Sequence, residues 1–153
     1  MTSETKRHIR RLLWRWGKTT VTCARLQKQR HDYLALIESA TDVHGSPLTG
    51  MPGSGKVGDP TARAAERLAY LREKYEGMAD LIEQEIISEI EFAKSIEIAM
   101  QNLDVQQRRI IDMHYRMGMS YVRIGEETYY SERQVKRYEA KAVVDLGEYI
   151  LTK

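Results

Sequence analysis

Cysteine, proline and phenylalanine are scarce in this chain of 153 residues, which contains one, three and one of them. The single cysteine, Cys23, excludes an internal disulfide and fits a reducing compartment. No apolar run approaches the ~18–20 residues that cross a bilayer. The basic N-terminus also lacks the continuous apolar segment of a signal peptide. We therefore expect a cytoplasmic protein that does not enter a membrane.

Side chains with metal-binding or catalytic spacing are missing as well. The four histidines show no i,i+4 pairing with one another or with Cys23, so we expect no metal site. The sequence supports no Ser-His-Asp or Cys-His arrangement of the kind that activates a nucleophile. We therefore expect no catalytic site and no cofactor, and a protein that is not an enzyme.

The segment from Gly50 to Val57, GMPGSGKV, resembles a phosphate-binding P-loop but departs from it in composition and context. Val57 stands where a P-loop needs serine or threonine to hold Mg²⁺. No strand-like apolar run precedes the segment, and glycine, aspartate and proline delay any helix until residue 60. We therefore interpret Leu48 to Pro60 as part of a linker.

Charge and hydrophobic spacing divide the first 101 residues into two arms, 4–38 and 61–101, joined by linker 39–60. The linker holds all three prolines and five of the ten glycines. Residues 1–38 carry nine basic and three acidic side chains, whereas residues 59–101 carry five basic and ten acidic ones. Both arms follow a heptad-like seam, which slips near Ile86. This pattern predicts an all-α protein in which residues 1–101 form a long antiparallel, coiled-coil-like helical hairpin. The seam positions are Ile9, Leu12, Trp16, Thr19, Cys23, Leu26, Arg30, Tyr33 and Ile37 in the first arm, and Leu68, Leu71, Tyr75, Met78, Ile82, Ile86, Ile90, Ala93 and Glu97 in the second.

Residues 102–153 have the pattern of a three-helix domain that ends in a helix-turn-helix. Gly118 is a candidate C′ glycine after a first helix, Leu103 to Met117. Ser120 and Ser131 are N-cap candidates for the two helices that follow, because a serine oxygen accepts from backbone N–H groups at a helix start. We therefore expect a short helix, a tight turn and a second helix.

The last helix separates apolar from cationic side chains. Val135 and Tyr138 face inward, and we expect them to pack on Ile111 and Ile124. Cationic and amide side chains in the first turns of such a helix place hydrogen-bond donors in a major groove, so we expect double-stranded DNA as the partner. Direct readout would come from Ser131, Glu132, Arg133, Gln134 and Arg137, and phosphate contacts from Lys136, Lys141, Arg123 and Arg116.

The segment Leu103–Leu146 resembles region 4 of primary-type sigma factors. It has an Arg-Ile-Ile helix, Tyr-x-x-Gly-x-Ser, a second short helix, then Ser-x-x-x-Val-Lys and a closing leucine. Two positions depart from that pattern, with Gly125 in place of the usual alanine and Tyr129 in place of the usual turn glycine. A tyrosine at positive φ costs roughly 1 kcal/mol or more, so we expect a turn that is longer or differently built.

The whole layout is similar to the ArpU/RinA group of phage and prophage regulators of late genes, most specifically in Leu48–Pro60 and Leu103–Leu146. The resemblance implies a transcription activator that works in a bacterial host cell and meets bacterial RNA polymerase. A single recognition helix of this size rarely suffices, so we expect either a homo-oligomer or recruitment by the polymerase. The alternative is a helical oligomeric structural or packaging-type adaptor that binds DNA only weakly.

Trp14 lies off the seam, among Arg10, Arg11, Arg15 and Lys18. Packing of its ring on the acidic arm or on a second copy of the chain is the favoured interpretation. The alternative is a protein or nucleic-acid contact through an aromatic ring set among cations.

Overall fold

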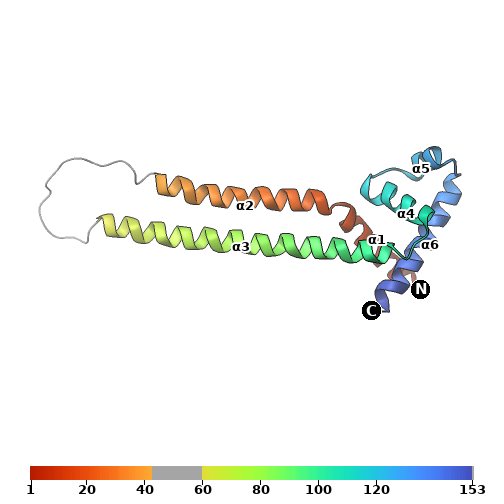
Figure 1. The fold of residues 1–153 in the computed structure, drawn as a ribbon, viewed down its shortest axis with the longest axis horizontal. Helices are drawn as coiled ribbons and strands as arrows, with labels where there is room; N and C mark the ends of the chain where they lie inside the picture. Colours follow the sequence, from red (N-terminus) through yellow and green to blue (C-terminus); the bar gives the residue numbers. More distant parts are fainter. Residues whose placement is uncertain (43–59, 153) are drawn as a thin grey trace, which may run out of the picture. The chain divides into compact units, whose positions relative to one another are not determined.

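The computed structural model describes residues 1–42 and 60–152, and over that part of the chain it contains helices and no strands (Figure 1). The predicted all-α class is therefore confirmed. The P-loop-like segment and the linker up to residue 59 lie outside the described residues. In chain order the elements are α1 (Ser3–Gly17), α2 (Thr19–Asp42), α3 (Pro60–Met100), α4 (Val105–Ile111), a π-helical turn η1 (Asp112–Arg116), α5 (Tyr121–Thr128) and α6 (Glu132–Leu151).

The two predicted arms differ in how well they match the helices. The second arm is one helix, α3, which begins at Pro60 as expected from the fixed φ of proline at a first turn. A single helix over 4–38 is wrong, because α1 ends at Gly17 and α2 begins at Thr19. Lys18 closes α1, and its backbone N–H donates to the carbonyls of Arg15 and Trp16.

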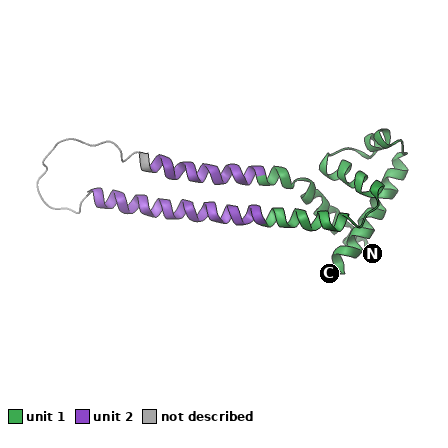
Figure 2. Ribbon diagram, in the orientation of Figure 1, with its two compact units in different colours: residues 1–23, 88–153 green, residues 24–87 purple. Residues whose placement is uncertain are grey.

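The chain forms two compact units whose limits differ from the predicted domains 1–101 and 102–153 (Figure 2). Unit 1 combines Met1–Cys23 with Ser88–Lys153, and unit 2 is Ala24–Ile87. Unit 1 thus contains α1 and the end of α3 as well as all of the C-terminal helices. The predicted boundary at residue 101 falls inside unit 1.

The main core of unit 1 joins the N-terminal helix to the C-terminal ones. Ile9, Leu13 and Trp16 line the buried face of α1, so the seam in this helix passes through Leu13 where Leu12 was expected. They pack with side chains from α3, the α3–α4 connection, α4, η1 and α6, which are Ile96, Ala99, Met100, Leu103, Ile111, Tyr115, Ala142, Val143 and Leu146. Without α1 this core would be open on one side.

Gly17 marks the closest approach of α1 to η1. A Cβ at this position would lie 1.9 Å from the carbonyl oxygen of Tyr115 and 2.6 Å from its carbonyl carbon. Real Cβ atoms do not come that near to backbone, so only glycine permits this packing. The break between α1 and α2 therefore coincides with a tertiary contact.

In unit 2, residues of α2 and α3 face each other over a narrow seam. Leu26, Ile37, Ala79 and Ile86 are its buried apolar side chains. The rings of Tyr33 and Tyr75 lie 6.0 Å apart between their centroids, and Arg30 reaches Glu83 at 3.6 Å. The predicted seam positions Leu26, Tyr33, Ile37, Tyr75 and Ile86 thus lie at least partly inside, whereas Met78 is 36% exposed.

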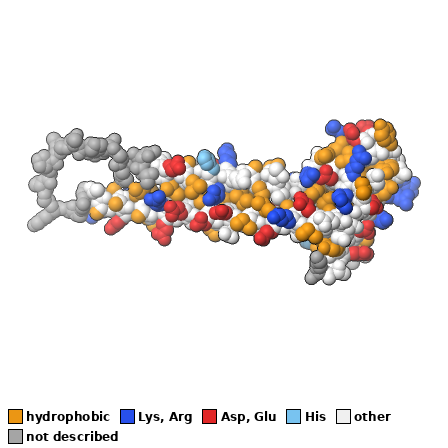
Figure 3. Space-filling view, viewed as in Figure 1, with side chains coloured by type: hydrophobic (Ala, Val, Ile, Leu, Met, Phe, Trp, Pro, Cys, Tyr) orange, Lys and Arg blue, Asp and Glu red, His pale blue; other side chains and the backbone are white. Residues whose placement is uncertain are grey.

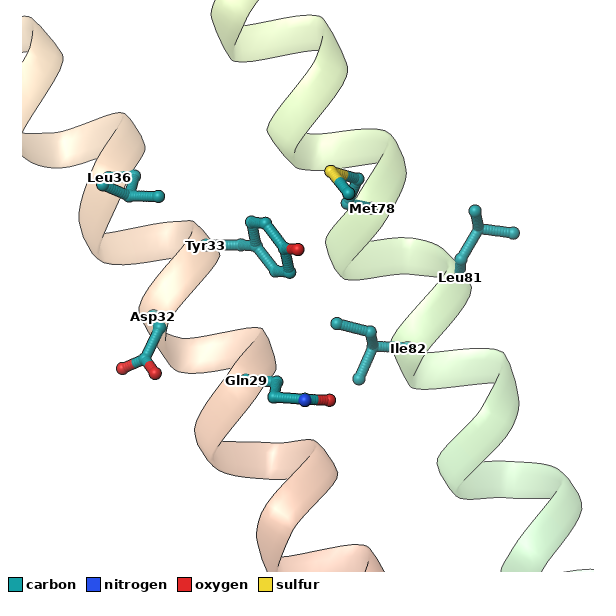
Figure 4. Close-up of a pocket in the computed structure, with 7 residues that line it drawn as sticks. All are labelled: Gln29, Asp32, Tyr33, Leu36, Met78, Leu81 and Ile82. Carbon is teal, nitrogen blue, oxygen red and sulfur yellow. The ribbon is translucent and has the colours of Figure 1, made fainter.

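An apolar groove runs along one side of this seam, with Tyr33 and Leu36 of α2 facing Met78 and Ile82 of α3 (Figure 4). Leu81, at the rim of the groove, is 71% exposed. Apolar side chains are also visible along unit 2 between acidic and basic ones (Figure 3). None of the described helices combines the length and apolar character that crossing a membrane requires.

Replacement of Gly17 by alanine should destabilise the protein by about 1–3 kcal/mol or more, because the new methyl group meets the backbone of η1. Gly77 is the matched control, since it lies inside α3 and a Cβ added there would have nothing within 4 Å. Gly77→Ala should stabilise by about 0.5–1 kcal/mol. Urea unfolding followed by circular dichroism measures both. A Gly17→Ala midpoint equal to that of the parent would contradict the close contact.

Candidate nucleic-acid interface

Each helix of the C-terminal segment begins at a side-chain cap. The Asp104 carboxylate accepts from the Gln107 N–H at 2.8 Å, and the Gln107 side chain accepts from the Asp104 N–H at 3.0 Å. Ser120 caps α5, and Ser131 caps α6 through a similar reciprocal pair with Gln134. Both serine predictions are confirmed. Such caps satisfy N–H groups that the helix itself leaves without partners.

The turn between α5 and α6 keeps the left-handed residue that the pattern requires. Tyr129 itself adopts φ +60°, so the expectation of a longer or differently built turn is wrong. Its side chain is 95% exposed and gains no packing that would offset the strain. A Cβ at Gly125 would lie 2.6 Å from the Tyr130 carbonyl oxygen, so the glycine in place of alanine lets this turn fold back onto α5.

A small second core fixes α5 and α6 to the preceding helix. It consists of Ile110, Met113, Ile124 and Val135, with Tyr138 among the side chains packed against it. The predicted packing of Val135 on Ile124 is confirmed. The predicted partner Ile111 is wrong, because that side chain belongs to the main core and its neighbour Ile110 takes the place. The π-helical turn that follows then starts one residue later, at Asp112.

Behind the outward face of α6, a buried carboxylate ties this helix to α1. Glu139 is 2% exposed, and its two oxygens accept from Nε and a terminal nitrogen of Arg10, both at 2.9 Å. The Tyr115 hydroxyl donates to the same carboxylate at 2.6 Å. The hydrogen bond to Glu139 raises the pKa of Arg10, and burial followed by that hydrogen bond raises the pKa of Tyr115. The carboxylate therefore has the charged and polar partners that burial demands.

Sequence reasoning missed Arg10, Tyr115 and Glu139 as supports of this helix. A signal for one of them was present, since Glu139 lies at i+4 from Val135 on the inward face of α6. A carboxylate on an apolar face requires a buried partner. The sequence did not show that the partner would be Arg10, which is 129 positions away.

An aromatic cluster links α1 to the start of α5. The Trp14 ring lies 5.3 Å from that of His114 and 4.9 Å from that of Tyr115. His114 stacks on Tyr121 at 4.3 Å, and its Nδ1 lies 2.8 Å from the Met119 carbonyl oxygen. Trp14 thus packs on η1, so the prediction that it packs on the acidic arm is wrong. The ring remains 40% exposed.

The structure brings five of the nine predicted DNA-binding residues together. Beside Ala140, a shallow surface hollow on α6 is lined by Ser131, Glu132, Arg133, Lys136 and Arg137. Within this set Lys136 forms an ion pair with Glu132 one turn earlier. Arg133 and Arg137 are exposed and one turn apart.

The other four predicted residues lie outside the hollow. Gln134 is exposed, but its side-chain oxygen accepts from the Ser131 N–H at 3.1 Å. Lys141 on α6 and Arg123 on α5 are also exposed. Arg116 lies in η1, where it pairs with Asp112 at 2.8 Å and sits 5.6 Å from the ring centroid of Trp16.

No family model, curated protein or solved structure matches the chain. Among the described residues, no group of three or more His, Cys, Asp or Glu side chains could hold a metal ion. The chemistry of the α6 surface is therefore that of cations and hydrogen-bond donors on a capped helix.

Replacement of Tyr115 by phenylalanine should change how stability depends on alkaline pH. The folded state raises the pKa of this phenol above its usual 10.0, so it favours the neutral form. The resulting stability is complete below about pH 10 and is lost as pH rises further, by up to about 1.4 kcal/mol per pH unit. Tyr115→Phe should lack this part of the loss, whereas burial of Tyr121, which also raises its pKa, remains in both proteins.

Urea unfolding at several pH values between about 8 and 11 tests this linkage. The control is Tyr70→Phe, which removes a phenol that is 64% exposed and should leave the profile of the parent unchanged. Parallel profiles for Tyr115→Phe and the parent would show that the buried phenol is not the source of the alkaline loss.

Proposed function

We propose that this protein is a sequence-specific DNA-binding transcription regulator that inserts the start of α6 into a major groove. The observation that carries the proposal is the outward face of α6, where Arg133 and Arg137 stand one turn apart on a helix capped by Ser131 and anchored by Val135. Neither arginine has an ion pair among the described residues. Their donors are therefore available to an outside acceptor.

The two arginines suit guanine, because a guanidinium donates to the O6 and N7 acceptors of that base in the major groove. Adenine readout by Gln134 requires both its oxygen and its nitrogen, and its oxygen is engaged in the cap of α6. Gln134 thus supports the helix start at the expense of a bidentate base contact. Lys141 and Arg123, which are exposed outside the hollow, would bind phosphates.

The finer parts of the proposal rest on sequence resemblance together with these contacts. In this view α2 and α3 form a helical hairpin, α4 to α6 form a sigma region 4-like helix-turn-helix, and the chain acts on late genes of the ArpU/RinA type with bacterial RNA polymerase. The left-handed Tyr129 and the caps at Ser120 and Ser131 support the second of these statements. The Arg30–Glu83 ion pair supports the first.

Arg133→Ala and Lys141→Ala should weaken DNA binding in different ways. Arg133→Ala should leave the melting temperature nearly unchanged, weaken specific binding by roughly 1–3 kcal/mol and relax preference at one base position. Lys141→Ala should weaken binding to all sequences alike and reduce the salt slope by about one unit. Gel shifts on sequences selected from a random duplex library, and on the promoter regions nearest to the gene, measure both effects. Parent-like binding by both variants would remove the support for DNA readout by α6.

A helical oligomeric adaptor is the second candidate, and the apolar groove of unit 2 favours it. Tyr33, Leu36, Met78 and Ile82 line an open groove with Leu81 exposed at its edge (Figure 4). A second copy of the chain would cover these side chains and enlarge a seam with few buried residues.

Leu81→Glu should shift the protein toward monomer if copies associate through this groove, because a charge would enter the apolar contact. Analytical ultracentrifugation measures the change in mass, with Ile98→Glu as a control that alters an exposed apolar residue in unit 1. An adaptor would assemble in this way and show no sequence preference on DNA. Equal masses for Leu81→Glu and the parent would exclude the groove as the association surface.

A further inference from the structure

The outward face of α1 carries a row of side chains that the proposed α6 readout does not use. Arg7, Arg11, Trp14 and Lys18 follow one another at steps of four, three and four, so they share one face of the helix. We name these four residues the α1 stripe. The three cations are exposed, and Trp14 is 40% exposed.

The cations of the α1 stripe differ from their neighbours in having no acidic partner. Arg10 is bound to Glu139, and Arg15 forms an ion pair with Glu89. Arg7, Arg11 and Lys18 form no ion pair with any residue that the structure describes. Three positive charges thus lie along about 16 Å of helix, at 1.5 Å per residue. A surface of this kind attracts a polyanion.

Ring contacts connect the α1 stripe to the α6 face within unit 1. Trp14 contacts His114 at 5.3 Å, and His114 stacks on Tyr121 at 4.3 Å between ring centroids. The ammonium of Lys136 then lies 5.7 Å from the Tyr121 ring centroid. Lys136 lines the same hollow as Arg133 and Arg137. The surface therefore passes from α1 to α6 through packed side chains.

We propose that the α1 stripe binds the phosphate backbone of the same duplex whose major groove α6 reads. This inference rests on the proposed function, because it takes α6 as the element that places the duplex. Phosphate contacts fix register and supply affinity without reading sequence, which suits cations that lie beside a reading helix. The exposed edge of Trp14 would lie against the sugar-phosphate chain between them.

Binding of the full-length protein to a random-sequence duplex of about three helical turns tests the α1 stripe. The test variant is Arg7→Ala/Arg11→Ala/Lys18→Ala. The control is Arg63→Ala/Arg67→Ala/Lys74→Ala, which removes the same charge from exposed positions of α3 in unit 2. Fluorescence anisotropy at several salt concentrations gives the slope of log K against log salt. The test variant should reduce this slope by about 2–3 units, at ~0.9 per phosphate released, and the control by less than one.

Hydroxyl-radical footprinting on a duplex selected with the parent locates the contact. The test variant should keep protection where α6 binds and lose protection of backbone at one side of it, and the control should keep both. This result supports the proposal. A test variant with the slope and footprint of the control would overturn it while leaving the α6 proposal in place. Loss of RNA polymerase binding with unchanged DNA binding would also overturn it, in favour of an acidic protein partner.

A parent that shows no binding to any selected or random duplex would overturn both the proposed function and this inference. Arg133→Ala distinguishes the two failures when the parent does bind, because it should relax base preference whether or not α1 touches DNA. Circular dichroism of the three proteins confirms that equal helix content is being compared.

Discussion

The buried carboxylate of Glu139 is the interaction on which the C-terminal half of this protein depends. An ion removed from water is tolerated only with close charged and hydrogen-bonding partners, and here they come from α1 and η1. Loss of one partner of such a pair commonly costs about 3–5 kcal/mol. The orientation of α6, which carries Arg133 and Arg137, is therefore set from behind by Arg10 of α1. A residue near the start of the chain thus supports the face we propose for DNA.

This dependence changes how the chain divides. The C-terminal helices look self-sufficient in the sequence, yet their core includes Ile9, Leu13 and Trp16 of α1 and Ile96 of α3. A segment cut at residue 102 would expose those apolar contacts and leave Glu139 buried or half-buried without Arg10. The helix-turn-helix is thus part of a larger packed body, and α1 belongs to it as much as α5 does.

Features with short-range causes could be predicted from the sequence, and features with long-range causes could not. The caps at Ser120 and Ser131 and the start of α3 at Pro60 depend on neighbours within a few residues, and they were found. The end of α1 at Gly17 depends on the Tyr115 backbone, and the choice of Ile110 over Ile111 depends on where the π-helical turn begins. Heptad spacing alone contains neither fact. Trp14 was misplaced for the same reason, because its partners His114 and Tyr115 are remote in sequence.

The local hydrogen bonds of α6 also restrict what its surface can read. Gln134 closes the cap with Ser131, and Lys136 is paired with Glu132, so both are held by the helix itself. Arg133 and Arg137 then carry the base contacts, which limits specific recognition to a few positions of guanine character. Two such contacts give modest discrimination, and the remaining affinity must come from the backbone or from a second copy. The α1 stripe meets that need within one chain, since its cations are attached to the helix that fixes α6.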